Sequence, residues 1–110
     1  MLISLVSDTH LPKGKRRLPE RCVIDAEGIA IAVVHDAGPR TGRLGRMRHR
    51  FPGAAAVVFG HSHIPWHEEQ DGFQIFNPGS PTERRRAPAH TMGLARVTAG
   101  AIAFELVTLD

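Results

Sequence analysis

Short apolar runs dominate the hydrophobic pattern of this chain. The runs at residues 2–7, 29–34 and 54–59 are apolar almost throughout and are followed by polar residues or glycine, as expected of buried strands. Residues 22–25, followed by a Glu-Gly turn, precede the second run and predict a hairpin with it. The first half of the chain is therefore expected to be rich in strands.

One segment has the spacing of a helix. Residues 40–50 place Leu44 and Met47 on one face, and a Phe-Pro-Gly sequence follows. Beyond residue 63 we expect antiparallel structure. The strongest hairpin signal is at residues 66–76, around an Asp-Gly turn, and a second hairpin is predicted at residues 92–109.

The length of 110 residues suits one compact domain, and no linker or internal repeat divides it. We predict a single α/β domain over residues 1–110, with more strand than helix. No apolar run approaches the roughly 20 residues of a membrane span, and no basic region precedes the first strand, so neither a membrane segment nor a signal peptide is expected. The single cysteine, Cys22, cannot form an internal disulfide, which favours a cytoplasmic location and a small buried thiol.

The net charge of +3 is concentrated in two short basic clusters, residues 13–17 and 84–86. A nucleic-acid surface needs such charges on one face, preferably with aromatic rings between them. Aromatic residues make up only 5% of this chain, so we expect solvated loops and no nucleic-acid partner. Basic loops around an anionic phosphate substrate are the alternative.

Candidate chemistry lies where three of the apolar runs end. The first run leads into Asp8 and His10, the second into His35, and the third into His61 and His63. Residues that follow neighbouring strands converge on one edge of an α/β sheet. Imidazole and carboxylate groups together suit zinc, manganese or iron, so the pattern predicts a metal site.

Five neighbouring residues are expected to support this site or to stay outside it. Gly60 would let the backbone turn so that both following histidines face the metal. Asp36 should point away from its neighbouring histidine. Asn77 and Ser80 should shape a turn beside the site, and His67 is expected to be structural.

Four motifs carry a family resemblance: Asp8-x-His10, His35 after an apolar strand, Gly60-His61-Ser62-His63 and Asn77-Pro78-Gly79-Ser80. Together they resemble the calcineurin-like metallophosphoesterases, especially their small bacterial and archaeal phosphodiesterases. The resemblance implies a two-sheet α/β sandwich flanked by helices. It further implies hydrolysis of phosphate esters by a metal-bound hydroxide.

The resemblance also assigns the site residues. Asp8, His10 and His63 match ligands of a first metal, and His35 and His61 match ligands of a second. His35, His61 and His63 are the implied catalytic residues. Manganese is the first expectation for the metal, with zinc, iron or nickel as alternatives and one or two ions per chain. The implied substrate is a phosphate-ester small molecule or nucleotide, without a membrane partner.

This chain departs from the family pattern after its first strand. Two family blocks are absent: a strand ending in Gly-Asp, whose carboxylate bridges the metals, and one whose Asn amide binds the second metal. An internal segment with strands and helices is therefore expected to be missing around residues 13–20, which would expose sheet edges and either favour homo-oligomers or lower the stability. Without the bridge, one metal is the expected occupancy. The alternatives are an inactive metal-binding remnant, with a regulatory role or none, and a truncated product.

Overall fold

In the computed structural model, the described residues fall into four segments: 1–5, 21–62, 64–80 and 89–109. Both basic clusters of the sequence lie outside these segments. Among the described residues, no helix is long and apolar enough to cross a membrane.

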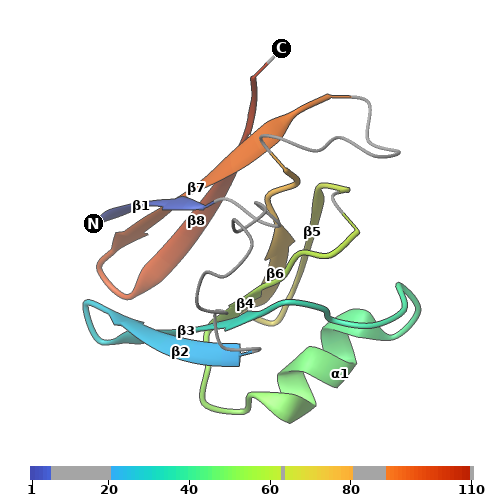
Figure 1. Cartoon of the computed structure of the whole chain (residues 1–110). Coiled ribbons are helices and arrows are strands. Elements are labelled where there is room, and N and C mark those ends of the chain that lie inside the picture. The colour runs from blue at the N-terminus through green and yellow to red at the C-terminus, as the bar shows by residue number, and fades with distance from the viewer. Residues whose placement is uncertain (6–20, 63, 81–88, 110) are drawn as a thin grey trace, which may run out of the picture.

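Eight strands and one helix make up the described part of the chain. In order they are β1 (Leu2–Leu5), β2 (Arg21–Ala26), β3 (Ile29–Val34), α1 (Arg43–Arg50), β4 (Ala56–Val58), β5 (Trp66–Gln70), β6 (Phe73–Asn77), β7 (Thr91–Thr98) and β8 (Ala101–Thr108). Five strands form one sheet, in the order β2-β3-β4-β6-β5, and three form another, in the order β1-β7-β8. Figure 1 shows α1 on one side of the larger sheet and the smaller sheet on the other, a layered α/β arrangement.

The three predicted hairpins are confirmed. β2 pairs with β3, β5 with β6 and β7 with β8, each antiparallel. Each two-residue turn places both residues at positive φ, which matches the right-handed twist of the strands. The turns are Glu27–Gly28, Asp71–Gly72 and Ala99–Gly100.

The strand pairing in the two sheets corrects two expectations. β6 pairs antiparallel with β5 but parallel with β4, so the region after residue 63 is not purely antiparallel. β1 pairs with β7 in the smaller sheet, so it is not a sheet neighbour of β3 or β4. Both errors have one cause: an apolar run predicts burial of a strand but does not specify its long-range partner.

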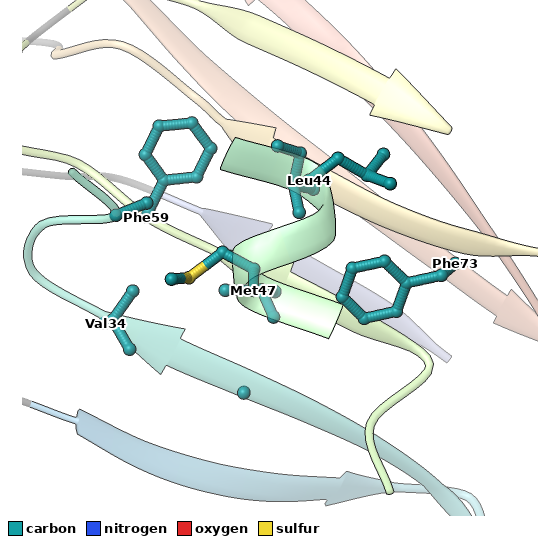
Figure 2. Packing of buried hydrophobic residues seen from close by; sticks show 9 residues of the cluster. Val34, Leu44, Met47, Phe59 and Phe73 are labelled. Carbon is teal, nitrogen blue, oxygen red and sulfur yellow. The ribbon is translucent and has the colours of Figure 1, made fainter. Parts of the chain in front are cut away.

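The helix packs against the larger sheet through a continuous apolar cluster. Leu44 and Met47 are buried, as predicted, against side chains that include Val34, Phe59 and Phe73 (Figure 2). The helix begins at residue 43 rather than 40, because the residue before it is a glycine with φ of 72°.

A second cluster lies between the two sheets. Ile29, Ile31 and Val58 of the larger sheet pack with Val97 of the smaller one. β2 contributes little to either cluster, since only the last of its six residues is buried. Cys22 lies on this strand and is exposed, so the expectation of a buried thiol is wrong.

Candidate functional site

The parallel pair β3 and β4 brings two of the predicted site residues together. Val33 of β3 is in register with Val58 of β4, so the two strands end side by side. Just beyond them, the Gly60 amide donates a hydrogen bond to the His35 carbonyl oxygen at 3.1 Å. This backbone bond fixes the loop that carries His61 beside the loop that carries His35.

The imidazoles of His35 and His61 meet above these strand ends. His35 Nε2 lies 3.1 Å from His61 Nδ1, and the ring planes are inclined at 75° with centroids 5.0 Å apart. Both residues are exposed. The contact is a hydrogen bond when one nitrogen carries a proton. When neither nitrogen does, both lone pairs can bind the same cation.

The separation of these nitrogens fits a shared metal ion. Two imidazole nitrogens at about 2.1 Å from one ion, at the angles of tetrahedral or octahedral coordination, lie roughly 3.0–3.4 Å apart. The observed 3.1 Å falls in that range. Imidazole is also a preferred ligand of zinc, copper, iron and nickel. The pair is therefore compatible with the divalent metal that the sequence predicts.

The backbone at His61 is in the left-handed region, with φ of 75°. Such values are uncommon outside glycine, and they accumulate at functional sites. We predicted from the sequence that the backbone turns at Gly60, whereas the residue with the left-handed backbone conformation is His61 itself. The turn aims the ring of His61 back toward the end of β3.

Asn77 connects the end of β6 to the same site. Its side-chain amide donates to the Ser62 hydroxyl at 3.3 Å and lies 3.5 Å from the Gly60 carbonyl oxygen. Its side-chain oxygen accepts a hydrogen bond from the Gly79 amide at 2.9 Å. The predicted role in a turn is confirmed, but the link to the histidine loop was missed. That link depends on the parallel pairing of β4 and β6.

The loop after Asn77 is held tightly against β7. The Thr91 hydroxyl donates to the Pro78 carbonyl oxygen at 2.8 Å, and both Asn77 and Ser80 are buried. Gly79 has φ of 72°, and a Cβ there would collide with the Thr91 side chain. Only glycine fits this position, so the Asn-Pro-Gly-Ser motif is a rigid brace behind the histidines.

Arginines from α1 hold the loop that follows His35. Arg46 Nη2 donates to the Ala37 and Pro39 carbonyl oxygens at 2.6 Å, and Arg43 Nη2 donates to the Gly38 carbonyl oxygen at 2.9 Å. The Asp36 carboxylate accepts a hydrogen bond from the Gly38 amide at 2.8 Å, so it caps its own turn.

Positive charge accumulates along this loop. The Arg40 guanidinium stacks over the Trp66 ring at 4.5 Å, and that of Arg43 stacks over Phe59 at 4.7 Å. Burial lowers the pKa of the Arg43 guanidinium, and the charges of Arg46 and Arg40 lower it further. The three guanidinium groups place positive charge along this loop, and the nearby carboxylates of Glu68 and Asp36 offset part of it.

Of the five predicted metal ligands, the structure describes His35 and His61 and brings them together. Asp8, His10 and His63 lie outside the described residues. Within the described segments, no group of three or more His, Cys, Asp or Glu side chains could hold a metal. His67, which was not predicted to be a ligand, contacts Gln74 at 2.8 Å and the ring of Phe76, as its predicted structural role requires.

A family model identifies the class to which this fold and site belong. The model for the calcineurin-like phosphoesterase superfamily domain matches residues 12–100. The chain therefore belongs to the calcineurin-like phosphoesterase superfamily, as its motifs predicted. No curated protein is similar enough in sequence to count as a match.

Solved structures of similar proteins share the fold. A Thermotoga maritima protein is 28% identical, with a TM-score of 0.58 over 84% of this chain and 55% of its own. Vps29 of Entamoeba histolytica, solved with zinc, is 21% identical, with a TM-score of 0.62 over 86% of this chain and 63% of its own. An archaeal phosphodiesterase is 16% identical, with a TM-score of 0.56 over 80% of this chain and 51% of its own. The chain thus spans between half and two thirds of these relatives.

Proposed function

We propose that this chain is a metal-dependent phosphoesterase that hydrolyses phosphate esters, with phosphodiesters as the first substrates to test. The observation that supports this most is the pair of imidazole nitrogens 3.1 Å apart at the ends of two parallel strands. The superfamily match and the similarity to an archaeal phosphodiesterase support the same class of reaction.

We assign the metal to His35 and His61, together with Asp8, His10 and His63, which the family motifs match to ligands. A bound divalent cation would supply Lewis-acid polarisation of the phosphate and activation of water. Manganese is our first candidate, and zinc, present in the Vps29 structure, is the second. His35, His61 and His63 are the proposed catalytic residues.

The protein's own groups would bind and orient the substrate. The arginines beside the loop at residues 35–40 favour approach of an anion, and we propose that Arg40, which is exposed, contacts a phosphate oxygen. The Asn77 brace holds His61 in position, so that the imidazoles need not reorganise when substrate binds. We propose that one domain over residues 1–110 carries this site, shortened relative to the family sandwich after β1.

Hydrolysis of bis(p-nitrophenyl) phosphate in added manganese tests this function. We expect turnover by the unaltered chain and a loss of at least about 100-fold in His35→Ala and His61→Ala. The matched control is His49→Ala, because His49 is an exposed histidine of α1 outside the site. Equal activity in all four proteins would show that the turnover comes from a contaminant or another site.

The second candidate is a metal-binding protein without turnover. Two observations favour it: similarity to Vps29, a vacuolar protein sorting protein, and coverage of little more than half the length of the first relatives. It predicts that the chain binds metal through His35 and His61 but hydrolyses no phosphate ester. Metal content and turnover measured on one sample therefore distinguish the two candidates.

A further inference from the structure

β2 is the outermost strand of the five-stranded sheet in the described part of the chain. It pairs with β3 through all six residues, from Arg21 with Val34 to Ala26 with Ile29. Its first five residues are exposed, including Val23 at 59% and Ile24 at 38%. An edge strand that exposes apolar side chains and backbone hydrogen-bonding groups is a template for another strand.

The sequence of β2 is complementary to itself in charge. Arg21, Val23 and Asp25 lie on one face of the strand, because side chains alternate between the faces. When such a strand meets an antiparallel copy centred on Val23, Arg21 of each copy lies opposite Asp25 of the other. The pairing creates two opposite-charge contacts and one apolar contact on the same face.

We propose that β2 forms an antiparallel pair with β2 of a second copy of this chain, about a two-fold axis through Val23. The partner is inferred from the complementarity: the same patch serves both copies, as a closed two-fold interface requires. The larger sheets of the two copies then form one continuous sheet. Both copies of α1 lie on the same face, and Cys22 lies opposite Ile24 of the other copy.

Charge reversal at the ends of the strand tests the interface. Sedimentation equilibrium of the full unaltered chain should give twice the mass of a monomer. In Arg21→Asp, both cross-strand pairs become repulsive, so the dissociation constant should rise about tenfold or more. The double variant Arg21→Asp with Asp25→Arg restores opposite charges and should restore the dimer. A monomeric unaltered chain, or a dimer whose dissociation constant is the same in these variants, would overturn the proposal.

A crosslink tests the register. Cys22→Ser with Val23→Cys places one cysteine on the two-fold axis, directly opposite its copy at a separation that a disulfide can bridge. Mild oxidation should therefore convert this variant to a covalent dimer. The control is Cys22→Ser with Thr98→Cys, which places the cysteine at an exposed position of β7 in the other sheet. Equal crosslinking in both variants, or faster crosslinking through Cys22 alone, would exclude this register.

Hydrogen exchange distinguishes pairing of β2 with a second copy from coverage of β2 by another segment of the same chain. If copies pair, the outward-facing amides of β2 become more protected as the protein concentration rises. Protection that does not change with concentration would mean that β2 is covered within one chain, and the proposal would fail. The amides of β7, which lies between β1 and β8, serve as an internal control.

Discussion

Within one five-stranded sheet, the central parallel strands and the edge strand β2 differ in burial and in pairing. β4 and β6 are buried along their whole length, and the loops that follow them are joined through Asn77 and the Gly60 backbone. β2 pairs on one side and exposes five of its six residues. The candidate metal site therefore lies at the end of the most constrained part of the sheet, whereas the edge is suited to association.

The largest expected effect is in the cluster beneath the site. Phe59→Ala removes a fully buried ring that packs against α1 and supports the Arg43 guanidinium. We expect the free energy of unfolding to fall by about 3–5 kcal/mol. Urea denaturation measures the change in the free energy of unfolding. Val23→Ala in β2 is the edge-strand control, and we expect it to change the free energy of unfolding of the monomer by less than about 0.5 kcal/mol. Similar losses of stability in both variants would contradict the contrast between the buried centre of the sheet and its exposed edge.

A smaller effect is expected at the brace. Asn77→Ala removes the amide that donates to Ser62 and the oxygen that accepts from Gly79, in a residue that is 0% exposed. The loss should be about 1–3 kcal/mol, because buried partners stay unsatisfied. Metal affinity should fall as well, since the loop of His61 loses a support. Gln70→Ala, at an exposed position of β5, is the control. A metal affinity unchanged by Asn77→Ala would show that Asn77 does not support the metal site.

The smallest effect concerns the backbone at His61. Alanine is strained at φ of 75° while glycine is not, so His61→Gly should be about 1 kcal/mol more stable than His61→Ala. Both variants should lose metal equally, because neither has the imidazole. Thermal unfolding in the presence of a chelator measures the difference without a contribution from bound metal. An alanine variant as stable as the glycine variant would show that the left-handed turn is not retained.

The sequence predicted the local elements well and the long-range links poorly. The hairpin at the Asp71–Gly72 turn, the buried pair Leu44 and Met47, and the closeness of His35 and His61 all depend on short-range signals or on parallel strand ends. The exposure of Cys22 and the link from Asn77 to Ser62 depend on which strands become neighbours. Apolar runs do not encode that choice, because each run is compatible with several partners.

The metal content of the purified chain shows whether His35 and His61 are metal ligands. After dialysis against manganese or zinc and removal of free ion, elemental analysis should find at least one metal per chain in the unaltered protein and in His49→Ala. His35→Ala and His61→Ala should each lose that metal while keeping the cooperative unfolding of a folded domain. Full metal content in both site variants would contradict the assignment of His35 and His61 as ligands.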